Sequence, residues 1–360
     1  MKKVAYSLIA ISGLFFINAC HKDNSIDPEI EITDDETDIY LSQIATNVIQ
    51  KTYLDLSEKS EKLYMAIDKF NKTSNDTDLS DCKTLWKSTR QSWEQSEGFL
   101  FGPVATENID PRIDTWPVNY VDLDSVLKNG PTPITAAYVD GLEDALKGFH
   151  PIEYLLFGQD GSKTTAQFTS REKEYLIALA DNLRKLAKEA SLSWDPSTTK
   201  NYNEVFLKPG EANDVYKTKL AVYEEVLNAM SGICDEVANG KIEEPLAAND
   251  PSLEESPFAQ NSIKDFTDNI ISVQNVYYGK YASFDGAGLE DIVKSSNLAL
   301  DKQMKAAFNE AVSALNNITD PFGKAITTQK QQVKTAQDKI NALKDFIDNN
   351  LTPYIKTQVK

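Results

Sequence analysis

Residues 340–354 read INALKDFIDNNLTPY, and this stretch places an apolar side chain at every third or fourth position. The apolar positions are Ile340, Leu343, Ile347, Leu351 and Tyr354. That spacing puts them on one face of an α-helix, whereas a half-buried strand would alternate at every second residue. The stretch therefore predicts an amphipathic helix that packs one face against a core.

The same helical period begins near Asp38 and recurs along the chain, and no run of strand-like alternation competes with it. We expect one helix to begin near residue 38 and another to lie at the end of the chain. Between them we expect helices near 78–98, 134–157, 169–191, 212–239, 258–278 and 296–318. Breaks at Trp194–Ser197 and Thr319–Pro321 agree with this division, and Asn75 can cap a helix start. The pattern predicts an all-α protein.

The length of 360 residues exceeds what one hydrophobic core usually serves. Eight long helices are enough for two four-helix bundles. We therefore predict an N-terminal helical bundle at 38–200, a C-terminal bundle at 201–360, and a cleft between them.

The segment 99–133 breaks the helical pattern. It contains several prolines that forbid one long helix, and aromatic side chains such as Phe99, Phe101 and Trp116 that can pack onto the body. A long irregular loop in a compact helical protein is usually functional or disordered. Its aromatic content favours a functional loop.

The N-terminus has the features of a lipoprotein signal peptide at 1–19. Lys2 and Lys3 precede an apolar run, which ends in a cleavage box before Cys20. The acidic, polar segment 20–37 has little to bury and is predicted to be a flexible tether. We expect an exported protein, held to the bacterial outer membrane by lipid on Cys20 and facing the periplasm or the cell surface.

The formal net charge is −18 and is spread along the chain. Such a surface repels nucleic acid, so we expect no nucleic-acid partner, and it tolerates cations.

Cys82 and Cys234 are the cysteines that remain after Cys20. An exported protein could pair them, but they lie in different predicted bundles. Two separate buried thiols are the preferred interpretation, and a disulfide is the alternative.

The segment 148–158 reads GFHPIEYLLFG. His150 and Glu153 are three residues apart, so on a helix they face the same way and can share one ligand. Gly148 and Pro151 flank the histidine, and a proline can kink the helix and open a face. A hydrogen-bonded structural histidine is the plain alternative to a metal or substrate site.

The chain has two histidines, and His21 lies in the predicted tether. A catalytic zinc site of the usual protease kind needs at least two from the protein, so it does not fit. One imidazole among many carboxylates suits iron, manganese or calcium. Candidate acidic partners of His150 are Glu94, Glu97, Asp110 and Asp114. No serine or cysteine nucleophile signature and no phosphate-binding loop is present, and a heme would have to bind noncovalently.

A polar cluster follows at 254–279. Ser256 before Pro257 is a good helix cap, and Asp265, Asp268 and Asn269 fall on one helical face. That face either packs on neighbouring helices or lines the cleft.

These blocks together resemble the imelysin family, whose signature Gly-x-His-x-x-Glu matches Gly148, His150 and Glu153. Other matching blocks occur in order: Trp93 with Glu97 and Phe101-Gly102-Pro103, Ile113-Asp114 with Trp116-Pro117, Glu255-Ser256 to Gly279, and Gly288-Leu289. The resemblance spans most of the chain after the signal peptide.

The resemblance implies two helical bundles with the signature near their cleft, export or lipid anchoring, an iron connection and a peptidase label. Members of the family include iron-regulated proteins and an insulin-cleaving membrane protease. Matched by motif, His150, Glu153, Glu97 and Asp114 are the expected metal-site residues. Arg112 would orient a carboxylate or an anionic ligand.

Our leading hypothesis is a lipid-anchored protein that binds iron or another divalent cation, free or chelated, in the cleft and passes it to an uptake partner protein. A metallopeptidase with Glu153 or Glu97 as general base is the second hypothesis, and the single body histidine fits it less well. A non-enzymatic heme-binding or surface-interaction protein is the third.

Overall fold

The computed structural model describes residues 33–199, 201–211 and 213–359. The predicted signal peptide, Cys20 and the tether as far as residue 32 lie outside these ranges. None of the helices in the described ranges is both long enough and apolar enough to cross a membrane.

The first half of the chain is built from helices, with η marking 3-10 and π-helical turns. They are α1 (Asp34–Gln43), η1 (Ile44–Ile49), α2 (Gln50–Thr73), α3 (Asp76–Glu94), η2 (Glu97–Phe99), α4 (Pro103–Thr106), α5 (Ile109–Asp114), α6 (Tyr120–Asn129), α7 (Ala136–Asp140), η3 (Asp144–Leu146), α8 (Phe149–Phe157), η4 (Thr165–Gln167) and α9 (Ser170–Trp194).

The second half is also helical, apart from one short antiparallel hairpin of β1 (Lys280–Tyr281) and β2 (Phe284–Asp285). Its helices are α10 (Tyr202–Leu207), α11 (Lys219–Asp235), η5 (Glu236–Ile242), α12 (Glu243–Ala248), η6 (Pro251–Leu253), α13 (Ser262–Tyr278), α14 (Leu289–Ser296), α15 (Leu298–Asn316), α16 (Phe322–Thr328), α17 (Lys330–Phe346), η7 (Ile347–Leu351) and α18 (Thr352–Gln358). The predicted all-α class is confirmed.

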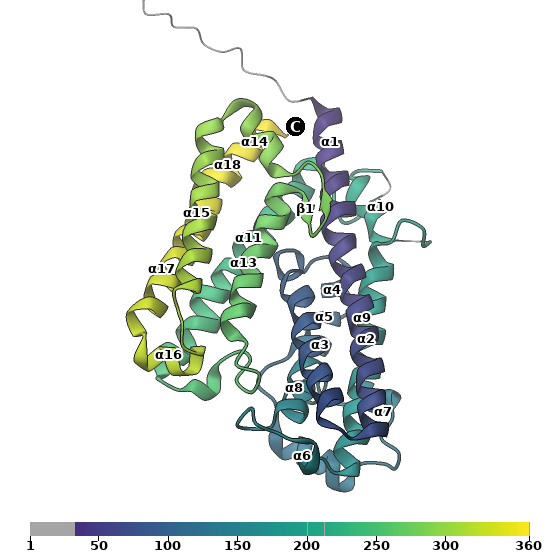
Figure 1. Cartoon of the computed structure of the whole chain (residues 1–360). Coiled ribbons are helices and arrows are strands. Elements are labelled where there is room, and N and C mark those ends of the chain that lie inside the picture. Colours follow the sequence, from purple (N-terminus) through teal and green to yellow (C-terminus); the bar gives the residue numbers. More distant parts are fainter. Residues whose placement is uncertain (1–32, 200, 212, 360) are drawn as a thin grey trace, which may run out of the picture. The chain divides into compact units, whose positions relative to one another are not determined.

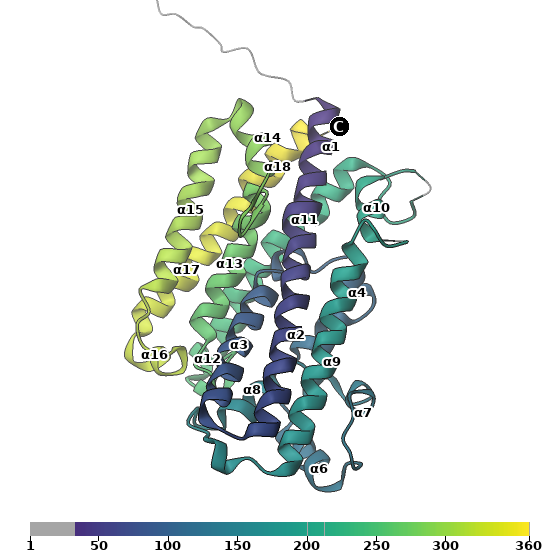
Figure 2. The same ribbon diagram turned by 45° about the vertical axis from the view of Figure 1, so that its right-hand side comes forward.

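The long helices pack side by side in two sets. Figures 1 and 2 show α2 running beside α3 and α9, and α15 running beside α17. Helices α11 and α13 pack on each other and on the α15–α17 pair, and α13 also packs on α3. Contacts join the described residues into one compact unit. The assignment of 38–200 and 201–360 to separate bundles stays a prediction.

The helix ends follow local capping chemistry. At the first end, the Thr33 side chain accepts a hydrogen bond from the Glu36 N–H, and Glu36 accepts one from the Thr33 N–H at 2.9 Å. This capping box starts α1 at Asp34 rather than at Asp38, because two backbone donors are satisfied there. Asn75 caps α3 as predicted.

The C-terminal stretch buries the face that its sequence predicts. Ile340, Leu343, Ile347 and Leu351 are fully buried, and the helix continues through the π-turn η7 into α18. Cys82 and Cys234 are both buried and free, as the preferred interpretation expected.

Three sequence-based boundaries were wrong. The predicted helix at 134–157 is three short pieces, since Gly141 ends α7 and Gly148 precedes α8. The segment 99–133 contains α4, α5 and α6 instead of an unbroken loop, and Pro103 occupies the first turn of α4, where its missing N–H costs nothing. Helix α13 begins at Ser262 and not after Ser256, whose N–H donates to the Ser262 hydroxyl at 3.0 Å.

Candidate metal centre

Gly148 positions the signature histidine at the start of α8. Its φ is +82°, and a Cβ added there would lie 2.0 Å from the carbonyl oxygen of Ile113. Only glycine allows α8 to approach the end of α5 this closely. The approach brings His150 against Asp114, the last residue of α5.

His150 is fully buried among carboxylates. Its Nε2 lies 3.1 Å from Asp114 Oδ1 and 3.8 Å from Glu255 Oε1, and its Nδ1 lies 3.5 Å from Glu153 Oε2. Neither ring nitrogen makes a well-aligned hydrogen bond within the described part of the chain. The Trp116 ring covers the imidazole, with centroids 4.8 Å apart.

Glu153 is held in place by the segment before α13. Its Oε1 accepts a hydrogen bond from the Ala259 N–H at 2.7 Å, and its Oε2 faces His150. One carboxylate therefore links α8 to the second half of the chain and orients the imidazole.

Arg90 on α3 is the central fixed cation of the site and is fully buried. Its guanidinium pairs with Asp114, Glu94 and Glu255, and its Nε lies 3.8 Å from Asp265 Oδ1. A buried guanidinium can satisfy several carboxylates at once because its donors form a rigid fork.

Lys241 on the π-helix η5 brings a second cation. Its Nζ lies 3.1 Å from Glu97 Oε2, 3.5 Å from Glu236 and Glu255 oxygens, and 3.9 Å from Glu94 Oε2. π-helical turns are frequent at functional sites.

Asn269 on α13 ties two of these acids together. Its Nδ2 donates to Glu94 Oε2 at 2.6 Å and to Glu97 Oε2 at 2.9 Å. The polar face of α13 is therefore buried against α3 and its acids, which agrees with the interpretation that it packs on neighbouring helices. No residue of α13 lines the described cleft beside this centre.

Around Arg90 and Lys241 there are more carboxylates than cations, and several of these acids have raised pKa values. Burial raises the pKa of Glu94 and Glu97 well above the ordinary glutamate value, against the lowering effect of the nearby cations. Burial also raises the pKa of Asp110 and of Asp265 to about 6. A cation placed here would replace protons that these acids otherwise hold.

Asp114 and His150 shift each other's pKa in opposite directions. Burial acts to raise the pKa of Asp114, but the charge of Arg90 and the contact with His150 hold it far below the usual range. Burial alone would lower the pKa of His150, yet Asp114 and Glu153 raise it to about 9. Without a metal, the ring is therefore a cation paired with Asp114.

An open cleft of about 400 Å³ reaches this centre. We call it the acidic cleft, and its charged lining residues are Glu97, Asp110, Asp114, Glu236, Lys241, Glu244 and Glu255. His150 is buried and contacts the cleft through Asp114 and Glu255.

The structure brings together most, not all, of the residues that the sequence singled out. His150 contacts both Asp114 and Glu153. Glu97 and Asp114 offer oxygens within 4.8 Å of each other, and Asp110 lines the cleft. Arg112 is directed elsewhere, because it pairs with Asp140 Oδ1 at 2.6 Å.

The sequence analysis missed Arg90 and Lys241, and noted Glu255 only within a matching block. Arg90 left a signal, since it sits between Trp86 and Trp93 at helical spacing on a face that should be apolar. Lys241 left none, because its acidic partners come from distant parts of the chain.

Comparison with known proteins settles the family. Residues 49–349 match the family model described as Imelysin. The chain belongs to the imelysin family. The resemblance inferred from the ordered blocks is thereby confirmed.

Relatives whose names refer to iron regulation match over most of the chain. The protein is 28% identical over 313 residues to iron-regulated protein A of Synechococcus elongatus, which covers 86% of this chain and 84% of the relative. A crystal structure assigned to an iron-regulated protein A precursor of Parabacteroides distasonis has a TM-score of 0.81 at 26% identity, over 92% of this chain and 96% of that one.

A further solved structure shares the fold. It is an imelysin-like protein from Psychrobacter arcticum, with a TM-score of 0.74 and 15% identity over 91% of this chain and 97% of that one. The arrangement of helices is therefore common to imelysin-like proteins whose sequences have diverged widely.

Proposed function

We propose that this imelysin-family protein binds a divalent cation, iron in the first place, in the acidic cleft, with Asp114, His150 and Glu255 as ligands. The observation that carries the proposal is that one ligand atom from each of these residues lies within 4.8 Å of the other two. One imidazole with carboxylate oxygens suits iron or manganese.

Glu153 orients the histidine in this proposal. Metal-bound histidines usually donate their second ring N–H to a carboxylate, which fixes the tautomer. Glu153 faces Nδ1, which leaves Nε2 toward Asp114 and Glu255. Its role thus shifts from the direct ligand that the sequence suggested to a support for one.

Iron is favoured by the relatives, two of which are named iron-regulated protein A. We extend the proposal to a lipid anchor on Cys20, export to the outer membrane and delivery of free or chelated iron to an uptake partner protein. The support for the anchor is the cleavage box before Cys20. The support for delivery is that the cleft opens to the surface and that a polar, acidic segment precedes the body in sequence.

The test is binding of Fe²⁺ without oxygen, and of Mn²⁺, to the purified chain by calorimetry. We expect one tight site that His150→Ala abolishes and Asp114→Asn weakens strongly. Asp140→Asn is the matched control, because it removes an acid outside the cleft. Equal binding by His150→Ala and the unchanged chain would overturn the proposal.

A metallopeptidase is the second candidate, and Glu97 favours it. Glu97 lines the cleft and has a raised pKa, which suits a general base near a metal-bound water. Glu153 suits that role less, because it is buried and tied to Ala259. Chelator-sensitive cleavage of a peptide library, lost in Glu97→Gln, would support the enzyme.

Heme binding has less support from the geometry. Both nitrogens of His150 face carboxylates, whereas an axial histidine must point at an open pocket that admits a porphyrin. A Soret band on adding hemin, altered in His150→Ala, would favour heme.

A further inference from the structure

Lys241 holds an unusual position. Among the cleft-lining side chains that the structure describes, it alone is positively charged. Its side chain is 9% exposed, and its ammonium lies within 4 Å of oxygens from Glu94, Glu97 and Glu255. A lysine ammonium is a compact point charge on a flexible stem, so it can occupy the place of a metal ion and also leave it.

Two groups of ligand atoms meet at Asp114. Asp114, His150 and Glu255 form the first group, and Glu94, Glu97 and Asp114 form the second, each with its atoms within 4.8 Å of one another. Asp114 belongs to both groups and has two oxygens. Its Oδ2 accepts a hydrogen bond from Trp93 Nε1 at 2.6 Å and its Oδ1 contacts Arg90 and His150, so a bridge between two ions would use the remaining lone pair of each oxygen. Paired metal ions in proteins lie about 3.5 to 4 Å apart.

In the second group, one buried carboxylate oxygen is held by an ion pair alone. Glu94 is fully buried, and its Oε1 makes no well-aligned hydrogen bond in the described ranges, although Arg90 lies 2.5 Å away. The nitrogens of His150 in the first group are in the same condition. Buried polar atoms are rarely left in this state unless a ligand or water completes them.

We propose that the acidic cleft binds two divalent cations bridged by Asp114, and that the ammonium of Lys241 occupies the second position until a second cation displaces it. The proposal rests on the proposed function for the first position. It adds a second position, formed by Glu94 and Glu97, and a lysine that controls its filling.

Exposed or cleft-lining carboxylates next to Lys241 can pair with its ammonium after displacement. Glu236 is 56% exposed and already lies 3.5 Å from Lys241, and Glu244 also lines the cleft. Arg90 has no such route, because it is fully buried and paired on several sides. Of these two cations, Lys241 is therefore the one that a metal ion can displace.

The test is a titration of the full chain with Mn²⁺, followed by calorimetry and by electron paramagnetic resonance. We expect two ions per chain, the second bound more weakly, and a spin-coupled spectrum when both are bound. Lys241→Met should tighten the second step by roughly tenfold or more, since the ion no longer competes with an ammonium. Lys241→Arg should keep the second step weak, because it keeps the charge.

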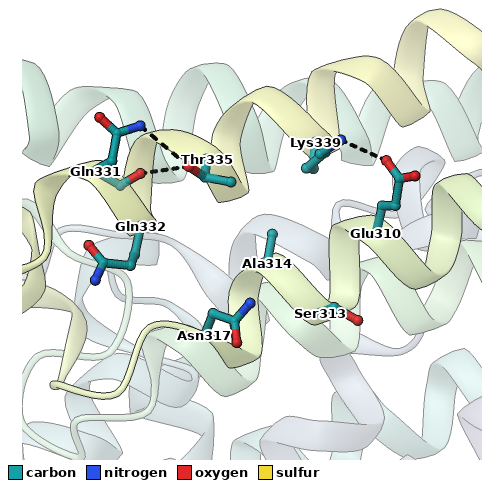
Figure 3. Close-up of a pocket in the computed structure, with 8 residues that line it drawn as sticks. All are labelled: Glu310, Ser313, Ala314, Asn317, Gln331, Gln332, Thr335 and Lys339. Atoms are coloured by element: carbon teal, nitrogen blue, oxygen red, sulfur yellow. Dashed lines mark hydrogen bonds and ion pairs between the residues drawn. The ribbon is translucent and has the colours of Figure 1, made fainter.

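Lys339→Met is the matched control. Lys339 lies on α17 and pairs with Glu310 on α15 at 2.7 Å, as Figure 3 shows, so its loss changes net charge equally outside the cleft. We expect it to leave both binding steps unchanged. Glu97→Gln should remove the second ion and keep the first.

The outcomes separate the two proposals. A single Mn²⁺ in the unchanged chain and in Lys241→Met, lost in His150→Ala, would overturn the second position and leave the first standing. Two ions without spin coupling would overturn the Asp114 bridge. No binding at all in a chain with native circular dichroism would overturn both.

Discussion

Nδ1 of His150 lies 3.5 Å from Glu153 Oε2, while Nε2 of the same ring faces Asp114 at 3.1 Å. The imidazole thus has an anion on each side. On the Nδ1 side, Glu153 is held in place by a hydrogen bond from the Ala259 N–H. On the Nε2 side, Asp114 lines the acidic cleft. In the proposed cation site, this asymmetry makes Glu153 the residue that would orient the ring and Asp114 the residue that would coordinate the ion.

The first prediction concerns Glu153→Gln. The amide keeps the shape but loses the charge that orients and polarises His150, so cation affinity should fall by about 10- to 100-fold. Mn²⁺ calorimetry measures it. Glu310→Gln, which removes an exposed acid on α15, should leave affinity unchanged. Complete loss of binding in Glu153→Gln would instead make Glu153 a ligand.

The second prediction concerns Arg90→Met. Removing this buried cation takes the closest counter-charge from Asp114, Glu94 and Glu255, which should lower the free energy of unfolding by about 3 to 5 kcal/mol at neutral pH. Urea denaturation measures it. Arg184→Met is the control, because Arg184 is paired at the surface with Glu61 and Asp181 and should cost less than about 1 kcal/mol. Equal losses would show that the buried network contributes nothing beyond a surface pair.

The third prediction is that the metal-free protein loses stability as the pH rises from 5 to 9. The His150 pKa is raised from 6.5 to about 9, so its contribution is full below 6.5 and is lost as the pH passes 9. The raised pKa values of Glu94, Glu97 and Asp265 act in the same direction, because these buried acids must ionise as the pH rises. The lowered pKa values of Asp114 and Glu255 matter only under more acidic conditions.

Thermal denaturation across this range, with and without Mn²⁺, measures the effect. The bound ion should reverse the trend, since its ligands must be deprotonated. His150→Ala should make the metal-free profile less steep, and the slope that remains should come from the buried acids. A metal-free profile that rises toward pH 9 would contradict the assigned charge states.

The sequence predicted the parts of this protein that depend on local pattern. Helical period located the long helices, and motif spacing located His150 and Glu153. It placed α13 too early and joined α7 to α8, because both boundaries depend on tertiary contacts: the Ser262 hydroxyl that holds Ser256, and the Ile113 carbonyl that Gly148 clears. The role of Lys241 could not be predicted for the same reason, because the acids that it pairs with come from α3 and η2, far away in the sequence.

The last prediction compares two glycines. Gly148→Ala should destabilise the fold and weaken cation binding, because φ is +82° and the new Cβ would collide with Ile113, which directly precedes Asp114. Gly232→Ala, inside α11, meets nothing within 4 Å and should stabilise by about 0.5 to 1 kcal/mol, since alanine favours the helix. Urea denaturation and Mn²⁺ calorimetry of both variants measure the contrast. If Gly148→Ala bound Mn²⁺ normally, the close approach of α8 to α5 would not be what brings His150 to Asp114.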